Sequence, residues 1–233
     1  MGPDRFSFAL EFAAAHSLPS SAVHAVQHHH AHVAAIAAEH GIHGPLLGLA
    51  LDGVGLGHDG AAWGGELLLV DGAACRRLGH LAPIAMPGGD VAAREPWRMA
   101  AAVLHRIGRG AEIEARFSTR PGAGAVAQML ERDLRCPRTT SMGRWFDAAA
   151  ALQGVREVSA YEGQAPMLLE ALAASGEPLA PGPDAGALVR IGADGTLDPT
   201  PLLACLVDED DARRGAALFH HALADGLARW VLQ

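Results

Sequence analysis

Cysteines, aromatic residues and basic charge are scarce in this sequence, and each shortage excludes a class of protein. Among 233 residues there are three cysteines, far apart and without CxxC spacing, which argues against a disulfide framework or a zinc ribbon and fits a reducing cytoplasm. The formal net charge of −8 leaves no general basic surface, so nucleic acid is not an expected partner. No apolar run approaches the length of a membrane span, so no membrane contact is expected.

Alanine and other small apolar residues take the place of aromatics. Half of the residues are hydrophobic, while only 5% are aromatic. Helices built from such residues should pack closely around a core with little aromatic bulk. A chain of this length can bury the core of one large domain or of two small ones. We therefore expect an α/β protein located in the cytoplasm.

Strand patterns are concentrated in the first half of the chain. Residues 46–51 are apolar throughout, as expected for a strand that is buried on both faces. The glycine-rich segment 52–60 should interrupt regular structure, and residues 63–70 should form the next strand. A turn at Asp71 and Gly72 predicts a hairpin with residues 76–81. Helical spacing predicts helices over 4–16, 30–40, 94–107, 124–134, 144–154, 163–175 and 208–232, with a loop over 176–186.

A cluster of histidines is the strongest sign of chemistry in the sequence. Four of the 13 histidines lie within the five positions 28–32, which indicates a divalent metal site. If this segment is helical, His28 and His32 lie one turn apart on one face, where both imidazoles can bind one ion, and His29 and His30 point elsewhere. If it is extended, His28, His30 and His32 share a face instead.

Three later segments add candidate ligand-binding groups. Asp52 follows the predicted buried strand and can supply an oxygen ligand beside the imidazoles, and the glycines after it allow a phosphate to approach the backbone. Residues 139–147 place hydroxyl groups and a glycine at a helix start, where Asp147 can hold a ribose hydroxyl. Gly163 opens the next helix and allows a ligand to come close.

These segments together resemble the HypF carbamoyltransferase family of [NiFe]-hydrogenase maturation. The resemblance rests on Val26 to His32, on Ala50 to Gly53 with Trp63 to Glu66, on Ser141 to Asp147 and on Tyr161 to Pro166, all in the family's order. They match the family's C-terminal transferase domain, which is similar to the tRNA threonylcarbamoyl-transferase domain. The resemblance implies an α/β fold of the actin/Hsp70-like (ASKHA) ATPase type, incomplete at both ends.

The resemblance also implies a function and a set of site residues. His28, His32 and Asp52 would be catalytic metal ligands, for iron, zinc or manganese. The site for carbamoyl-adenylate, AMP or ATP would be lined by Leu49, Ala50, Leu51, Asp52, Gly53, Asp147 and Gly163. The carbamoyl group would pass from carbamoyl-adenylate to the C-terminal cysteine of HypE, with AMP released. Residues 1–82 would form a metal- and phosphate-loop subdomain, and residues 83–233 a mainly helical nucleotide-binding portion, truncated at its C-terminus.

The sequence departs from the family pattern because the adenylate-forming domains and a fourth, late aspartate ligand are missing. The missing HypF-type domains would therefore act in cis or in trans. Two other functions remain open at this stage. One is carbamoylation of a small-molecule hydroxyl, and the other is a non-catalytic remnant that only binds nucleotide.

Overall fold

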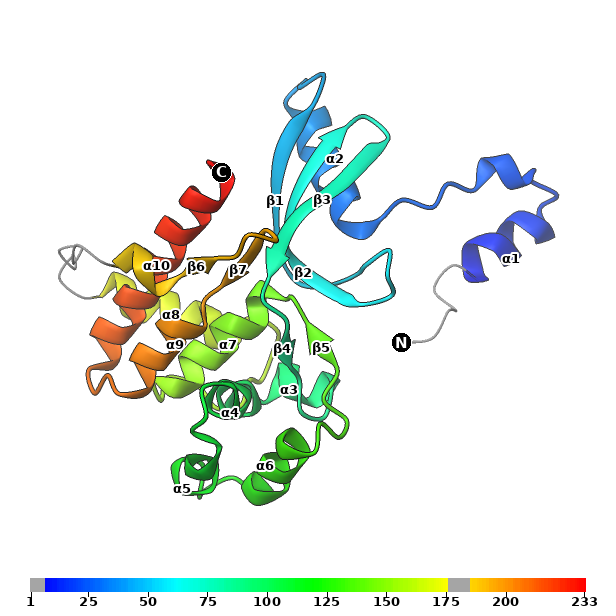
Figure 1. The fold of residues 1–233 in the computed structure, drawn as a ribbon. Coiled ribbons are helices and arrows are strands. Elements are labelled where there is room, and N and C mark those ends of the chain that lie inside the picture. The colour runs from blue at the N-terminus through cyan, green and yellow to red at the C-terminus, as the bar shows by residue number, and fades with distance from the viewer. Residues whose placement is uncertain (1–6, 176–184) are drawn as a thin grey trace.

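The computed structural model describes residues 7–175 and 185–233, which fold into one mixed sheet covered by helices (Figure 1). The helices are α1 (Ser7–Ala15), α2 (His28–Glu39), α3 (Asp90–Arg94), α4 (Pro96–Arg106), α5 (Ile113–Arg116), α6 (Ala123–Glu131), α7 (Met142–Leu152), α8 (Gln164–Ala174), α9 (Thr200–Val207) and α10 (Ala212–Val231). The strands are β1 (Leu46–Leu56), β2 (Ala62–Asp71), β3 (Ala74–Leu81), β4 (Ile84–Ala85), β5 (Arg138–Thr139), β6 (Arg190–Ile191) and β7 (Thr196–Asp198).

The sheet is built around the antiparallel strands β1, β2 and β3. The β2–β3 hairpin turns between Asp71 and Ala74, which confirms the turn predicted from the sequence. Strands β5 and β7, from the second half of the chain, pair in parallel with β2 and β3. Residues on both sides of the predicted boundary at 83–89 therefore share one sheet, and the boundary itself stays a prediction.

The first strand differs from the prediction in burial and in length. In β1 only alternate residues are buried, because α2 covers one face and Leu47, Leu49 and Leu51 on the other are 47%, 39% and 43% exposed. The prediction of burial on both faces was therefore wrong. The glycine-rich segment also does not end the strand, since β1 continues to Leu56.

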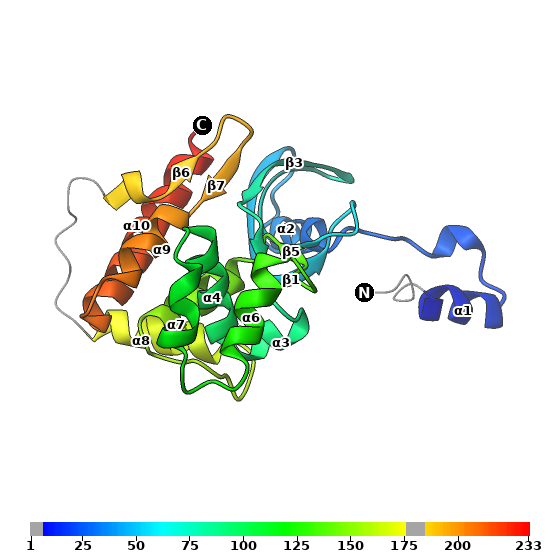
Figure 2. The same cartoon turned by 60° about the horizontal axis from the view of Figure 1, so that its bottom comes forward.

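The helices form a second layer against the sheet, and both views show them packed side by side (Figures 1 and 2). Close packing is possible because α4 and α7 meet through alanines, with Ala100 and Ala149 fully buried. Trp97 and Trp145 complete this core. The predicted helix over 208–232 corresponds to α10, which begins at Ala212 with Asp211 as its cap, whereas α9 is a separate helix before it that was not predicted.

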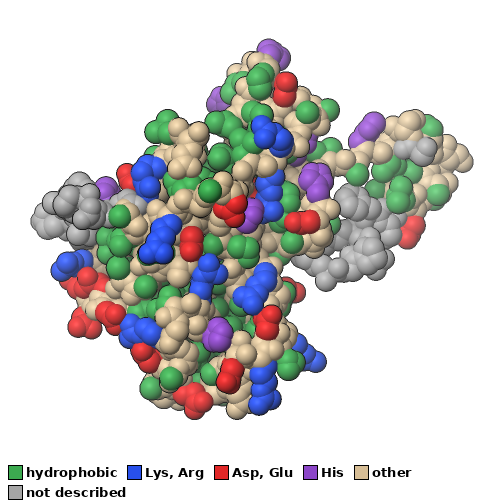
Figure 3. All heavy atoms as spheres, viewed as in Figure 1, with side chains coloured by type: hydrophobic (Ala, Val, Ile, Leu, Met, Phe, Trp, Pro, Cys, Tyr) green, Lys and Arg blue, Asp and Glu red, His purple; other side chains and the backbone are tan. Residues whose placement is uncertain are grey.

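Helix α1 stands apart from the rest of the fold at the end of an extended segment (Figure 2). Its hydrophobic side chains are visible on the surface of this arm (Figure 3), and Phe8 and Leu10 are 75% and 55% exposed. Residues 4–6 of the predicted first helix, and most of the predicted loop over 176–186, lie outside the described residues. Among the helices that are described, none is both long and apolar enough to cross a membrane.

Candidate metal and nucleotide site

The start of α2 places the histidine cluster. Gln27 is the N-cap residue, and its Oε1 accepts a hydrogen bond from the backbone N–H of His30 at 2.8 Å. The helical alternative for this segment therefore holds. His28 and His32 lie one turn apart with their side chains toward solvent, whereas His29 is fully buried.

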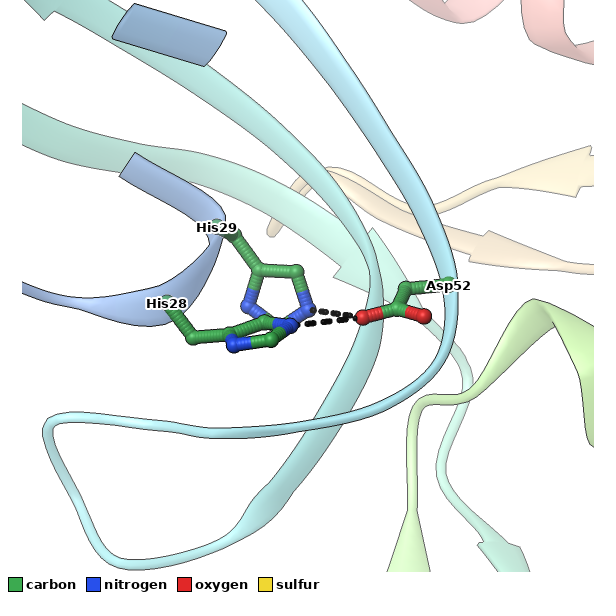
Figure 4. Close-up of side chains that lie close together, drawn as sticks. All are labelled: His28, His29 and Asp52. Carbon is green, nitrogen blue, oxygen red and sulfur yellow. Dashed lines mark hydrogen bonds and ion pairs between the residues drawn. The ribbon is translucent and has the colours of Figure 1, made fainter. Parts of the chain in front are cut away.

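A bulge in β1 carries Asp52. Leu51 pairs with Gly65 and Gly55 with Trp63, so three residues of β1 lie opposite Gly64 alone. A Cβ on Gly64 would lie 2.7 Å from the carbonyl oxygen of Asp52, so the bulge requires a glycine on the neighbouring strand. The bulge turns the Asp52 side chain toward the start of α2 (Figure 4).

The side chains of His28, His29 and Asp52 converge (Figure 4), with one potential ligand atom of each lying within 4.8 Å of the others. Asp52 Oδ2 lies 2.9 Å from His28 Nε2 and 3.7 Å from His29 Nε2. His32 joins the group through its Nε2, which is 3.1 Å from His28 Nε2. The structure therefore places His28 next to both Asp52 and His32, while the group whose ligand atoms all lie within 4.8 Å of one another contains His29 and not His32. It corrects the expectation that His29 points elsewhere.

This arrangement fits a divalent cation. A neutral imidazole nitrogen carries at most one hydrogen, yet His28 Nε2 faces both a carboxylate oxygen and a second imidazole nitrogen. A cation held by the lone pairs of all three atoms would remove this conflict. Ligands about 2.1 Å from a tetrahedral ion lie about 3.4 Å apart, somewhat longer than the 2.9 Å and 3.1 Å from His28 Nε2 to Asp52 Oδ2 and to His32 Nε2, so a bound ion would spread these atoms slightly.

The charges of the cluster favour a carboxylate beside neutral imidazoles. Burial alone would raise the pKa of Asp52, but hydrogen bonds from His28 and from the Gly53 amide outweigh it and hold the pKa below its usual range. Burial lowers the pKa of His29, despite the opposing charge of Glu66, so its neutral form is favoured. Neutral imidazole and ionised carboxylate are the forms that bind metal.

Gly55 lets β1 pass directly over the two imidazole rings. A Cβ at this position would lie 2.4 Å from Cδ2 of His28 and 2.6 Å from Cε1 of His29. Since real Cβ atoms do not come so close, any side chain at Gly55 would push both rings away from Asp52. Gly55, the second glycine of the predicted phosphate loop, therefore makes room for the imidazole rings of His28 and His29.

Two hollows meet at the β1 bulge. The first, of about 730 Å³, exposes His28 and His32 to solvent and is bounded by residues 54–58. The second, of about 350 Å³, lies on the helical side and includes Gly53, Arg94, Arg144 and residues 159–162. Val54 lines both. The metal cluster and a pocket with two arginines are therefore neighbours.

Ser141 links the β1 bulge, which borders the second hollow, to the start of helix α7. Its Oγ caps α7 by accepting from the Arg144 backbone N–H at 3.2 Å, and it donates to the carbonyl oxygen of Gly53 at 2.6 Å. The positive end of the α7 dipole therefore lies next to the bulge. The Arg144 side chain lines the pocket and pairs with Asp147 at 2.8 Å.

The remaining nucleotide-binding residues predicted from the sequence differ in how close they lie to the second hollow. Asp147 is buried behind Arg144 and is not among the residues that line the pocket, and burial raises its pKa to about 7. Gly163 caps α8 beside Glu162 with a φ of 78°. Leu49, Ala50 and Leu51 precede the bulge, and Ala50 faces α2. Their roles stay predictions.

Sequence reasoning missed Glu66, which anchors β2. This fully buried carboxylate accepts hydrogen bonds from the Gly64 and Gly65 amides, from Thr140 and from Arg77. The Arg77 guanidinium lies over the Trp63 ring, 3.9 Å from its centre, and Trp63 stacks against His29. A charged residue in an otherwise apolar strand was the available sign of this anchor.

The mixed α/β architecture is that of a Kae1-like transferase domain. Residues 48–233 match the family described as "Carbamoyltransferase, Kae1-like Domain, second subdomain". This chain belongs to the HypF carbamoyltransferase family. The fold and family expected from the sequence are thereby confirmed.

Curated relatives and solved structures agree with this assignment. Carbamoyltransferase HypF2 of Cupriavidus necator is 55% identical over 99% of this chain, which spans 31% of that protein. A HypF homolog from the same organism is 52% identical over 98% of this chain, which spans 60% of it. The chain thus covers less than two thirds of either relative.

Two crystal structures of HypF have the same fold. Full-length HypF in a phosphate- and nucleotide-bound form is 28% identical, with a TM-score of 0.78 over 96% of this chain and 30% of that one. HypF of T. kodakarensis is 29% identical, with a TM-score of 0.80 over 98% of this chain and 30% of that one.

Proposed function

We propose that this chain carries the metal- and phosphate-binding part of a carbamoyl-adenylate site. It would transfer the carbamoyl group to the C-terminal cysteine of HypE in the cytoplasm, a step in making the cyanide ligand of [NiFe]-hydrogenase. The adenylate-forming domains of a HypF-type protein would act in cis or in trans. The observation that carries the proposal is the meeting of His28, His32 and Asp52 beside a pocket with two arginines.

The pocket suits the phosphate of an adenylate. Arg94 and Arg144 line the pocket together with the carboxylates of Asp90 and Glu162, and Arg144 also pairs with Asp147. The capped start of α7 adds the positive end of a helix dipole on the arginine side. Gly53 has no side chain of its own, but Glu162 Oε1 lies 3.3 Å from where its Cβ would be, so Glu162 must turn away before a phosphate oxygen can approach the β1 backbone here. Tyr161, 55% exposed at the pocket rim, offers a ring against which a base can stack.

His28, His32 and Asp52 would hold the metal. When bound, it would supply a positive charge that polarises the mixed anhydride. The protein's own contribution is to orient the adenylate so that the carbamoyl carbon faces the hollow of about 730 Å³, through which a thiolate can approach. The sulfur then forms a bond to the carbamoyl carbon, the bond from that carbon to the phosphate oxygen breaks, and AMP leaves with the electron pair. The thiol has already released its proton to solvent.

The decisive experiment is carbamoyl transfer in trans. The chain would be mixed with HypE, metal, and carbamoyl-adenylate generated by the remaining domains of a HypF protein, and HypE would be analysed by mass spectrometry. We expect HypE to gain one carbamoyl group at its C-terminal cysteine. Folded protein that leaves HypE unmodified would contradict the proposal.

Two variants make this result specific. His28→Ala removes a proposed metal ligand and should abolish transfer. His105→Ala changes an exposed histidine at the end of α4, far from the cluster in the sequence and outside both hollows, and should leave transfer unchanged.

A further inference from the structure

His29 is the member of the cluster that the ligand set above leaves without a role. Its side chain is fully buried, and its Nε2 faces Asp52 Oδ2 at 3.7 Å, too far for a hydrogen bond. A buried polar atom without a partner in a cluster of potential ligands requires an explanation. Either His29 binds the metal as a third imidazole ligand, or it donates a hydrogen bond to the Asp52 carboxylate. The hydrogen bonds on the other side of its ring decide between these two.

The orientation of the Gln27 amide is fixed by two backbone groups. Its oxygen accepts from the backbone N–H of His30 at 2.8 Å, and its nitrogen donates to the carbonyl oxygen of Leu56 at 3.1 Å. Turning the amide over would set donor against donor and acceptor against acceptor. The Gln27 nitrogen is therefore the atom that lies 3.1 Å from His29 Nδ1.

This contact determines the tautomer of His29. The Gln27 nitrogen can only donate, so Nδ1 of His29 must accept, and an accepting Nδ1 carries no hydrogen. The hydrogen of the neutral ring is then on Nε2, the atom that faces Asp52. A protonated Nε2 has no lone pair with which to bind a metal.

The plane of the His29 ring is also fixed. The Trp63 ring stacks beside it at an interplanar angle of 26°, and Gly55 leaves just enough space on β1 for the imidazole. Arg77, itself paired with buried Glu66, lies over Trp63. The ring can therefore neither flip nor tilt away from the carboxylate without disturbing β2.

We propose that Gln27 and His29 are positioning residues, which keep a hydrogen on His29 Nε2 so that it holds the Asp52 carboxylate, while His28, His32 and Asp52 bind the metal. This inference rests on the proposed function for the identity of the ligands. With a metal bound, His28 Nε2 would no longer donate to Asp52, and His29 Nε2, 3.7 Å away in this structure, would be the donor left for the carboxylate to approach. Such a partner fixes a metal-bound carboxylate in one orientation.

Nuclear magnetic resonance of the whole chain tests the tautomer directly. In metal-free protein labelled with ¹⁵N-histidine, long-range nitrogen–proton correlations should show His29 with a bare Nδ1 and a protonated Nε2. Zinc, added as a diamagnetic probe, should shift His28 and His32 and leave the His29 pattern unchanged. A protonated Nδ1 in the wild type, or loss of the Nε2 hydrogen at zinc saturation, would overturn the proposal.

Gln27→Glu is the matched variant for the first residue of the pair. A carboxylate can still accept from the His30 backbone N–H, so the helix cap is kept, but it cannot donate to His29. Nδ1 of His29 should therefore become protonated in this variant. An unchanged bare Nδ1 would show that Gln27 does not set the tautomer.

Zinc affinity tests the role of His29. His29→Phe keeps an aromatic ring between Trp63 and β1 but removes the N–H, and should weaken zinc binding by about 10- to 100-fold. His30→Phe is the control, because His30 is also buried but bonds to the carbonyl oxygen of Gly72 and should bind zinc as the wild type does. Equal affinities of folded His29→Phe and wild type would refute the positioning role. If the wild type binds no zinc, the proposed function fails, and the tautomer is still decided by the metal-free spectra.

Discussion

Ser141 and Gly53 join the two halves of the candidate site through a hydrogen bond of 2.6 Å, donated by the serine hydroxyl to the glycine carbonyl oxygen. The same hydroxyl accepts the backbone N–H of Arg144 and so caps α7. One side chain therefore holds the bulge that carries Asp52 against the helix that carries Arg144. The distance between the metal cluster and the arginine pocket depends on it.

Replacing Ser141 by alanine should weaken both the fold and nucleotide binding. Loss of the cap should lower the free energy of unfolding by about 1 kcal/mol, and a loss of similar size in AMP binding would raise the Kd about fivefold. Urea denaturation and calorimetry measure the two effects. Asp211→Ala is the control, because Asp211 caps α10, which contributes no residue to either hollow. It should cost similar stability without changing the Kd for AMP. An equal loss of AMP affinity in both variants would contradict the link.

Gly55→Ala should disturb the metal cluster in particular. The new methyl group would meet the rings of His28 and His29 at less than van der Waals distance, which should cost about 1–3 kcal/mol of stability. Displaced ligands should also lower zinc affinity by about tenfold or more, as measured by competition with a chelating dye. Gly110→Ala adds the same methyl group where its nearest contact is 3.4 Å away, in a short helix far along the chain from the cluster. It should bind zinc normally.

Glu66→Gln should be strongly destabilising although it keeps the size of the side chain. Glu66 is fully buried and holds Arg77, so removing its charge leaves a guanidinium without its partner. We expect a loss of about 3–5 kcal/mol in the free energy of unfolding, measured by urea denaturation. Asp133→Asn removes one partner of the exposed Arg138–Asp133 pair and should cost at most about 1 kcal/mol. Similar losses for the two variants would show that burial of Glu66 has no effect.

Much of the fold follows from local patterns in the sequence. The turn at Asp71 and Gly72 predicts the β2–β3 hairpin, and helical spacing predicts α4, α6, α7 and α8 within a few residues. The burial of β1 could not be predicted in the same way. Leu47 and Leu49 are as apolar as a core residue, but whether another layer covers them is decided outside their own strand.

The site was predictable as far as residue spacing determines it. His32 lies four positions after His28, which brings their ring nitrogens together once the segment is helical. The role of His29 was not predictable, because a neighbouring residue on a helix points in a different direction. Only the bulge at Asp52 brings the carboxylate within reach of both rings, and this bulge depends on Gly64 of another strand.

The stability of the protein should depend on pH through Asp147. Burial raises the pKa of Asp147 to about 7, against the opposing charge of Arg144, whereas in an unfolded chain it is about 4. Between these values the native state holds a proton that the unfolded state has lost, so the free energy of unfolding falls as the pH rises from about 4 to about 7. Asp147→Asn does not titrate. The stability of the wild type relative to this variant should therefore fall by up to about 4 kcal/mol across that range, measured by urea denaturation. Parallel pH profiles for the two proteins would contradict this.

Metal removal should lower the thermal stability of the wild type. It should not change the thermal stability of variants that lack a metal ligand. A ligand that binds only the native state stabilises it by about 2.7 kcal/mol at a concentration 100 times its Kd. For a protein of this size, that corresponds to a rise of roughly 5–10 °C in Tm when zinc is added to chelator-treated protein. His28→Ala and Asp52→Ala should show no such rise, whereas His221→Ala, which changes a histidine on α10, should show the full rise. A zinc-dependent shift that survives in both ligand variants would place the metal elsewhere and would remove the basis for assigning catalysis to His28, His32 and Asp52.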